Sequence, residues 1–392
     1  MARILMSGLP AHGLVQPSFP LTRALVEAGH TVDYLMPAAF HPRIEALGAT
    51  PIGFAPYFPD ALTSPKQLAR DGRRLFADLH TELLARGNGY DAVISCGMNP
   101  RVPELERSLD VPVIAHQPVF FLDDAVARYF ADVAVGLPAP ARRVIRTERL
   151  RRVLGAVAGR AVFHAPLGDM IELLAAPSRT LNLTVASRYY QPFADHFDQP
   201  RCFFMGPTPT VRVPDPTFPL DRLDAHDGPV VYGTLGTVFN TWTPFFRTLA
   251  DAFAGTDVLL VLTTGNDANR AAVGPVADNV ILRSFVPQTD ILERADVCFT
   301  HGGFGSATDS VSAGIAPILT PRGADQFFNA YRLRELDAGS VLTSREFTAR
   351  AVRREAERIL AGAPSGLAPL RESFRTAPGP AGAVAAISRV IA

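Results

Sequence analysis

The chain alternates between short apolar runs, typical of buried strands, and longer segments with helical spacing. The first apolar run covers residues 2–7, helical spacing follows over 18–28 with Gly29 at its end, and a second run covers 30–37. A strand, a helix and a strand within about thirty residues predict a right-handed β-α-β unit with parallel strands.

The same alternation continues through the first half of the chain, so the fold class is α/β. Residues 120–180 are the exception, because they are mostly helical and rich in arginine. Outside that region the pattern predicts helices over 41–47, 66–86 and 100–108, and strands over 50–54, 91–96, 111–116, 180–187 and 201–207.

A proline-rich stretch, 208–228, interrupts the pattern and reads as a linker. The alternation then restarts, with strands expected over 229–236, 258–264, 279–285 and 295–300, and helices over 243–254, 325–337 and 346–362. We therefore expect an N-terminal domain over 1–207, a second domain over 229–375, and a C-terminal helix, 376–392, that packs back on the first. Both domains should be doubly wound and Rossmann-like, facing a central cleft.

Composition narrows the possible partners. The 392 residues are 47% hydrophobic and 19% charged, and 38 basic side chains balance 38 acidic ones. A neutral chain gives no electrostatic reason to expect nucleic acid, and no apolar run approaches the length of a membrane span. The scattered cysteines, Cys96, Cys202 and Cys298, read as free thiols, so a cytoplasmic location is expected.

The segment after strand 295–300 carries the strongest chemical signal. His301 and three glycines follow the strand, and a short helix is expected to begin near Ser306. A strand, a glycine-rich turn and a helix N-terminus present free backbone N–H groups and a positive dipole end to an anion. We expect a diphosphate to bind there, and we expect Asp325 and Gln326 to recognise the group attached to the diphosphate.

Four sequence blocks carry a resemblance to a known family. They are AHGLVQPSFPLTRALVEAGHTVDYL, TLNLTVASRYYQPFADHFDQPRCFFMGP, SFVPQTDIL, and THGGFGSATD followed by DQFFNA. With these blocks, the chain resembles the family 1 nucleotide-sugar-dependent glycosyltransferases of the GT-B fold, and among them the bacterial macrolide glycosyltransferases. The resemblance implies inverting, metal-independent transfer of a sugar from a UDP- or TDP-sugar to a small acceptor, with no cofactor and no metal.

On the donor side, the resemblance implies that Phe285 and Gln288 contact the nucleotide base and that Asp309 accepts hydrogen bonds from the ribose hydroxyls. Asp325 and Gln326 are implied to bind the sugar; a carboxylate and an amide suit a vicinal diol, which favours a hexose such as glucose. The diphosphate would be held by the remaining donor residues, Gly236, Thr237, His301, Gly303, Gly305 and Ser306.

On the acceptor side, the resemblance makes His12 the general base, because an imidazole titrates near working pH. The helical region 120–180 should form a hydrophobic pocket for an aromatic or polyketide-type acceptor. Its expected walls are Phe54, Phe120, Phe121, Tyr129 and Met170.

The base lacks its usual orienting acid. Related chains have Asp at the end of the strand near residue 96, where this chain has Ser95, Cys96 and Gly97. Another acid in the following loop, Asp124 or its neighbour Asp123, could substitute. Alternatively the acceptor needs little help from a base, or transfer is impaired and the protein binds without turnover.

Two other functions stay open at this point. The same scaffold could carry a sugar-nucleotide epimerase or hydrolase, although a base on the acceptor side argues against it. A non-catalytic, glycosyltransferase-like auxiliary protein would fit the lost acid, but it would not need His12 and the donor residues. A homodimer is possible with either function.

Overall fold

The chain divides into two compact units. The computed structural model describes residues 1–54, 65–134, 137–208, 212, 214–236, 240–323 and 325–391, and for His12 and residues 65–69 it describes the backbone alone. Unit 1 comprises Met1–Thr208 together with Ala377–Ala392, and unit 2 comprises Pro209–Thr376. Each unit has its own parallel sheet, so each is described by itself.

The sheet of unit 1 has seven parallel strands in the order β3-β2-β1-β4-β5-β6-β7. Nearly continuous apolar runs form its centre, as expected for strands covered on both faces. The chain order reverses between β1 and β4, where Gly8 pairs with Cys96. The strands are β1 (Arg3–Gly8), β2 (Thr31–Leu35), β3 (Thr50–Ile52), β4 (Ala92–Cys96), β5 (Val113–Gln117), β6 (Leu181–Thr184) and β7 (Cys202–Phe204).

Helices cover the unit 1 sheet. On one face, α4 and α5 bury apolar side chains such as Leu79 and Leu105 against Leu5 of β1 and Val93 of β4. The helices of the unit are α1 (His12–Val15), α2 (Phe19–Glu27), α3 (His41–Glu45), α4 (Pro65–Arg86), α5 (Val102–Ser108), α6 (Asp124–Val133), α7 (Ala139–Arg146), α8 (Glu148–Ala158) and α17 (Gly379–Ile391). Single turns occur at η1 (Gln16–Ser18), η2 (Ala38–Phe40), η3 (Gly87–Gly89), η4 (Gly159–Phe163), η5 (Met170–Leu173) and η6 (Ala194–Phe197).

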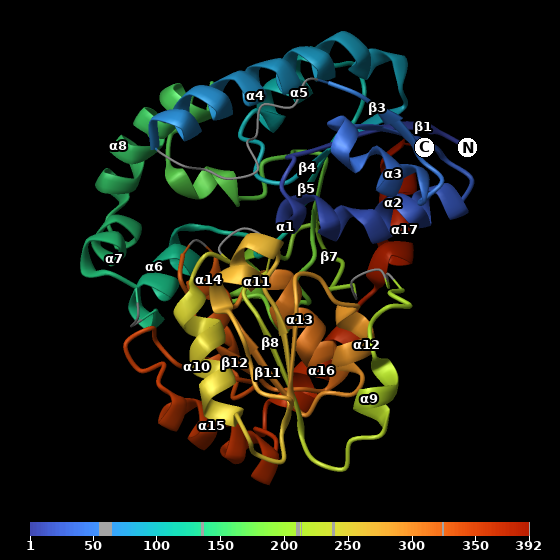
Figure 1. Cartoon of the computed structure of the whole chain (residues 1–392). Helices are drawn as coiled ribbons and strands as arrows, with labels where there is room; N and C mark the ends of the chain where they lie inside the picture. Colours follow the sequence, from blue (N-terminus) through green and yellow to red (C-terminus); the bar gives the residue numbers. More distant parts are fainter. Residues whose placement is uncertain are drawn as a thin grey trace. The chain divides into compact units, whose positions relative to one another are not determined.

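The last helix of the chain, α17, packs in unit 1, where it contacts α2 and β6 (Figure 1). The backbone N–H of Gly379 donates to the carbonyl of Met205 at 2.8 Å, and Ala383 and Ile387 are buried. The C-terminal segment therefore belongs to the core of the first unit, although the second unit precedes it in sequence.

Unit 2 repeats the arrangement with six parallel strands in the order β10-β9-β8-β11-β12-β13. Figure 1 shows α10 and α15 on one side of this sheet and α12, α13 and α16 on the other. Its strands are β8 (Val230–Thr234), β9 (Leu259–Thr263), β10 (Val280–Arg283), β11 (Val297–Thr300), β12 (Pro317–Leu319) and β13 (Ser340–Val341). Its helices are α9 (Leu220–Asp224), α10 (Thr243–Phe253), α11 (Asp267–Val273), α12 (Gln288–Leu292), α13 (Phe304–Ala313), α14 (Gln326–Glu335), α15 (Ala349–Ala361) and α16 (Leu367–Arg375).

Two doubly wound parallel sheets confirm the predicted fold class, but several short elements differ from the sequence prediction. The stretch expected as a linker contains α9, and the apolar side chains of Phe218 and Leu223 are buried in the unit 2 core. The helix after β11 begins at Phe304, two residues earlier than expected. Such short helices carry too few apolar positions for periodicity to reveal them.

No helix in the described part of the chain combines the length and the apolar character needed to cross a membrane.

Candidate functional site

The strongest candidate site lies where the strand order of unit 2 reverses, between β8 and β11. Thr234 at the end of β8 pairs with Thr300 at the end of β11, so the loops that follow both strands meet at one edge of the sheet. In open α/β sheets this reversal point is the usual place for a ligand. Gly236 follows the first strand and His301 follows the second.

The imidazole of His301 is enclosed by two glycines. A Cβ atom placed on Gly236 would lie 2.7 Å from Cε1 of the ring, and one placed on Gly303 would lie 2.6 Å from Nε2. Gly236 also has a φ of 67°, a left-handed conformation that favours glycine. Both positions therefore need glycine for the ring to lie between the two loops.

His301 is neutral at physiological pH. Burial lowers its pKa from 6.5 to about 4, because a buried imidazolium loses its hydration. A neutral ring carries one N–H donor and one lone pair, so it binds an anion only through the nitrogen that holds the proton.

The start of α13 supplies further donors. Gly303 precedes the helix without a side-chain cap, and the first backbone N–H groups of any helix lack partners within it. A Cβ atom placed on Gly305 would meet nothing within 4 Å, so the surface beside this first turn is open. Free N–H groups, the helix dipole and an open approach fit an anion such as a diphosphate.

A buried hydroxyl cluster supports the same turn. The Oγ1 of Thr300 lies 2.9 Å from the Oγ of Ser306 and 3.3 Å from Nδ1 of His301, and it accepts from the Gly302 N–H at 3.4 Å. The Ser306 hydroxyl also lies 3.2 Å from the Gly303 carbonyl, to which it can donate. Ser306 thus belongs to the framework of the turn.

The residues predicted to hold the nucleoside lie together. The side-chain amide of Gln288 donates to the Asp309 carboxylate at 2.9 Å, and the Tyr232 hydroxyl donates to the Gln288 carbonyl at 3.2 Å. Asp309 is only 8% exposed, whereas the Phe285 ring is 66% exposed and free to stack on a flat group. Their contacts with a nucleoside stay predictions.

The predicted sugar-binding pair divides into two roles. Asn329 donates to the Asp325 carboxylate at 3.0 Å and to the Gly302 carbonyl at 3.0 Å, so it ties the glycine turn to the start of α14. Burial raises the pKa of Asp325, and the hydrogen bond from Asn329 opposes that shift. Gln326 is 1% exposed, and its carbonyl accepts the N–H groups of Arg322 and Gly323 at 2.8 and 3.1 Å. Its contact with a sugar stays a prediction.

Thr237 lies outside the described residues, and nothing tests its predicted contact with phosphate.

The equivalent reversal point in unit 1 has different chemistry. His12 begins α1 directly after the β1 loop, and its side chain lies outside the described part of the structure. Cys96 ends the neighbouring strand, and burial raises the pKa of its thiol to about 12. The thiol contacts the hydroxyls of Tyr34 and Ser18, which lie 2.7 Å apart. A protonated thiol cannot stabilise an imidazolium as a carboxylate does.

The two acids proposed to replace the missing carboxylate have partners of their own. Asp124 pairs with Arg128 and with the buried Arg151, whose Nε also lies 3.1 Å from the Asp169 carboxylate. Asp123 caps α6 by accepting the Val126 N–H at 2.8 Å, and it lies 2.7 Å from Nδ1 of His196. A role of Asp124 beside His12 stays a prediction, and it would compete with these ion pairs.

The aromatic residues expected around an acceptor differ in exposure. Phe120 and Phe121 are 1% and 0% exposed and pack against Tyr190 and Phe197, so their rings belong to the interior of the unit. Phe54 is partly buried and packs on the cluster beneath α4 and α5. Tyr129 and Met170 are also partly buried. None of these positions is tested as an acceptor contact.

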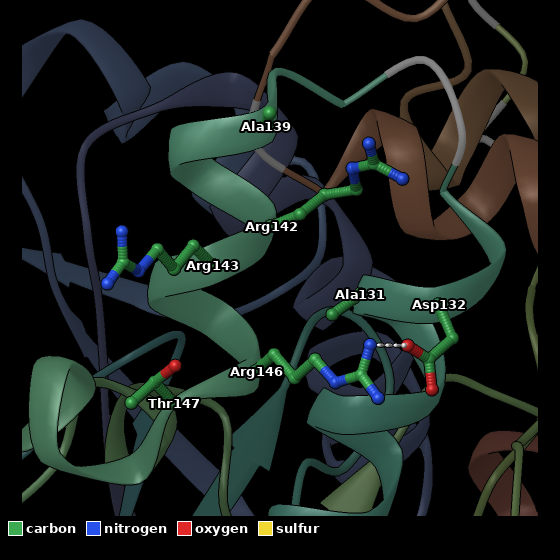
Figure 2. Close-up of a pocket in the computed structure, with 7 residues that line it drawn as sticks. All are labelled: Ala131, Asp132, Ala139, Arg142, Arg143, Arg146 and Thr147. Carbon is green, nitrogen blue, oxygen red and sulfur yellow. Dashed lines mark ion pairs between the residues drawn. The ribbon is translucent and has the colours of Figure 1, made fainter.

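The region expected to form an apolar pocket contains a cavity of about 490 Å³ with a basic lining (Figure 2). Arg146 from α7 pairs with Asp132 from α6 at 3.2 Å, and the side chains of Arg142 and Arg143 extend to different sides of α7. The lining comprises Ala131, Asp132, Ala139, Arg142, Arg143, Arg146 and Thr147. Its polarity does not suit the hydrophobic acceptor expected from the sequence.

Sequence reasoning missed the residues that support the site from a distance. Asn329 acts through a contact with Gly302, which is distant in sequence. Thr300 acts through a buried hydroxyl at the end of a strand, which the sequence pattern does not distinguish from other strand residues. The one available signal was proximity to His301 and Asp325. No group of three His, Cys, Asp or Glu side chains in the described ranges is arranged to hold a metal ion.

Comparison with known proteins agrees with the geometry. Residues 247–389 match the family model described as erythromycin biosynthesis protein CIII-like, C-terminal domain. The chain is 27% identical to the uncharacterized UDP-glucosyltransferase YdhE of Bacillus subtilis (strain 168), covering 96% of this chain and 95% of that protein. It is 28% identical to the oleandomycin glycosyltransferase of Streptomyces antibioticus, covering 91% and 82% of the two chains.

A solved structure resembles the whole chain. The crystal structure of the calicheamicin glycosyltransferase CalG4 matches with a TM-score of 0.75 and 26% identity, covering 100% of this chain and 98% of that one.

Proposed function

Because the chain belongs to the family 1 nucleotide-sugar-dependent glycosyltransferases of the GT-B fold, related to those of macrolide biosynthesis, we propose that it transfers a hexose, with inversion, from a UDP- or TDP-sugar to a hydrophobic small molecule. The observation that carries this proposal is the neutral ring of His301, held between Gly236 and Gly303 at the start of α13.

The donor half of the proposal assigns the diphosphate to the first turn of α13. Backbone N–H groups there and one N–H of His301 would bind the phosphate oxygens. The exposed Phe285 ring would stack on the base, and the Gln288–Asp309 pair would meet the nucleoside. Asp325 would accept hydroxyls of the sugar, which favours glucose over a heavily deoxygenated hexose.

The transfer itself would be one displacement at the anomeric carbon. An acceptor oxygen attacks that carbon as His12 takes its proton, and the bond from the carbon to the diphosphate breaks. The electron pair leaves with the diphosphate, where the preorganised donors stabilise the charge. Attack opposite the leaving group inverts the anomeric configuration. These donors are backbone and imidazole N–H groups, so we propose that the reaction needs no resident metal and no cofactor.

The acceptor class rests on the relatives. The oleandomycin and calicheamicin glycosyltransferases carry natural-product names, and a polyketide-type or aromatic acceptor is therefore proposed here. We propose that unit 1 binds the acceptor, with the aromatic side chains named above as the candidate contacts.

One observation favours a second function, that of a non-catalytic auxiliary protein. Cys96 occupies the place of the orienting acid, and Asp124 is engaged by two arginines. An auxiliary protein would retain the fold and lose turnover.

Mass spectrometry of reactions with a panel of nucleotide sugars and acceptors tests both functions. We expect a product heavier by one hexose from at least one donor and one aromatic or macrocyclic acceptor. Calorimetry should show UDP or TDP binding that EDTA does not change and that His301→Ala weakens strongly. Nucleotide binding without any product would favour the auxiliary function, and no nucleotide binding would overturn the proposed transfer.

A further inference from the structure

We propose that the buried hydroxyl of Thr300 holds His301 in the tautomer whose proton lies on Nε2, so that the ring can donate to the diphosphate. The inference deepens the proposed function and rests on it. Thr300 is a positioning residue here, because it would act on the ligand only through the imidazole.

The two edges of the ring have different surroundings. Nδ1 faces the Thr300 hydroxyl at 3.3 Å. Nε2 is the ring atom nearest to the position that a Cβ atom on Gly303 would take, and it also lies 3.1 Å from the corresponding position on Gly236. Nε2 is therefore directed at the glycine backbone where α13 begins and where the diphosphate is proposed. Among the described residues, Thr300 is the hydrogen-bond partner of the His301 ring.

The hydrogen bonds around Thr300 leave its proton for Nδ1. The Gly302 N–H donates to Oγ1, and Ser306, at 2.9 Å, can donate to the same oxygen. With both lone pairs of Oγ1 occupied, the Thr300 O–H can donate to Nδ1. Nδ1 then carries the lone pair, and the single proton of the neutral ring lies on Nε2.

A reversed arrangement also satisfies these groups in the free protein. Nδ1–H could donate to Thr300, Thr300 to Ser306, and Ser306 to the Gly303 carbonyl at 3.2 Å. That arrangement would direct the lone pair of Nε2 at the ligand site, where it would repel a phosphate oxygen. An anion therefore selects the first arrangement. That arrangement gives up the hydrogen bond from Ser306 to the Gly303 carbonyl and gains the one from Nε2–H to the anion.

The matched substitutions are Thr300→Val, which removes the hydroxyl, and Thr300→Ser, which restores it. Thr320→Val is the control. Thr320 is also fully buried, and its N–H donates to the Thr300 carbonyl at 2.8 Å. Its hydroxyl has no hydrogen-bond partner in the part of the chain that the structure describes.

The first measurement is nuclear magnetic resonance of protein labelled with ¹⁵N-histidine, free and with UDP or TDP. The nitrogen shifts distinguish a protonated from an unprotonated ring nitrogen. We expect Nε2 to be protonated and Nδ1 to accept a hydrogen bond in the wild-type complex, in Thr300→Ser and in Thr320→Val. In Thr300→Val the Nδ1 signal should lose its hydrogen-bond shift. A wild-type complex with the proton on Nδ1 would overturn the proposal.

The second measurement is calorimetry of the nucleotide series. Thr300→Val should weaken UDP binding by roughly tenfold, the effect of losing one hydrogen bond to a charged group, and should leave uridine binding unchanged. In the His301→Ala background, Thr300→Val should change UDP affinity by less than about twofold. An equal loss in both backgrounds would show that Thr300 acts on the turn alone and would overturn the proposal. Failure of the wild-type protein to bind UDP or TDP would instead refute the proposed function, and the free-protein spectrum would still report the tautomer.

Discussion

The two units share one topology, but their reversal points differ in what the strand ends carry. In unit 2, β11 ends at Thr300 and His301 follows it. The Thr300 hydroxyl lies within hydrogen-bond distance of the imidazole, and two glycines enclose the ring. In unit 1, β4 ends in Cys96, whose raised pKa keeps the thiol neutral beside two more hydroxyls. The same position in the same fold thus carries the proposed anion site in unit 2 and an uncharged strand end in unit 1.

This difference separates a site built from neighbouring residues from one that needs distant partners. The turn in unit 2 takes its ring, glycines and helix start from residues 301–306, and Gly236 and Asn329 contribute from other segments. In unit 1, the acids proposed to partner His12, Asp123 and Asp124, lie at the start of α6, and both already have partners. Changes at the two points should therefore affect different steps.

His12→Ala should give the largest effect and should act on turnover alone. Loss of a general base typically lowers the rate by about 10²–10⁴-fold, and unit 2, which holds the proposed nucleotide site, is a separate unit of the fold. Steady-state kinetics with the product-forming acceptor, together with UDP calorimetry, would measure both. A variant with full turnover would show that His12 is not the base, and a loss of UDP binding would break the proposed division between the units.

The turn after β11 was the local feature that the sequence predicted best, and its role in donor binding stays a prediction. A strand, a histidine, glycines and a helix start are all encoded within residues 295–313, so local rules were sufficient to place them. The fold class followed in the same way from the alternation of strands and helices. The start of α13 and the helix α9 were less well predicted, because short elements depend on tertiary packing.

The acceptor side could not be predicted as well, for a physical reason. The composition around Phe120 and Phe121 predicts a pocket wall, and the structure buries both rings. Aromatic side chains serve a core and a ligand equally well, so composition alone does not separate the two uses. Asp124 pairs with Arg128 at the i,i+4 spacing of a helix, but its ion pair with Arg151, which also pairs with Asp169, joins segments that no spacing rule relates. Long-range pairing of this kind is decided by the fold.

Acidification should destabilise unit 1 through His116, which lies beside Cys96 in the sheet. Its ring nitrogens have no hydrogen-bond partner among the described residues, and burial lowers its pKa from 6.5 to about 4. The unfolded chain therefore binds the proton first as the pH falls. The contribution of the neutral imidazole to the free energy of unfolding is fully present above pH 6.5 and is lost as the pH drops toward 4. The shift corresponds to about 3 kcal/mol. Denaturant unfolding at pH 7 and pH 4 measures this loss. Between the two pH values, the free energy of unfolding of His116→Leu should fall by that amount less than the free energy of the wild-type protein does. An unchanged pH dependence would contradict the assignment.

Asp124→Asn tests whether this residue serves structure or catalysis. The substitution removes the charge that pairs with the buried Arg151, although Asp169 remains as a partner. We expect a loss of about 2 kcal/mol in the free energy of unfolding, since hydrogen bonds to charged groups contribute about 1.5–3 kcal/mol. Turnover per folded molecule should change little. A fall in turnover that matches His12→Ala, at unchanged stability, would instead identify Asp124 as the orienting acid.

The smallest changes, Gly236→Ala and Gly305→Ala, separate the two uses of glycine within the donor site. At Gly236 the new methyl group meets the His301 ring and the backbone is left-handed, so we expect a loss of stability of about 1–2 kcal/mol. At Gly305 the methyl group meets only open space inside α13, where alanine is the better helix former by about 1 kcal/mol. Gly305→Ala should therefore raise the unfolding temperature slightly while weakening UDP binding several-fold, because the methyl group covers the approach to the first turn. Unchanged UDP affinity in this stabilised variant would place the diphosphate away from the start of α13.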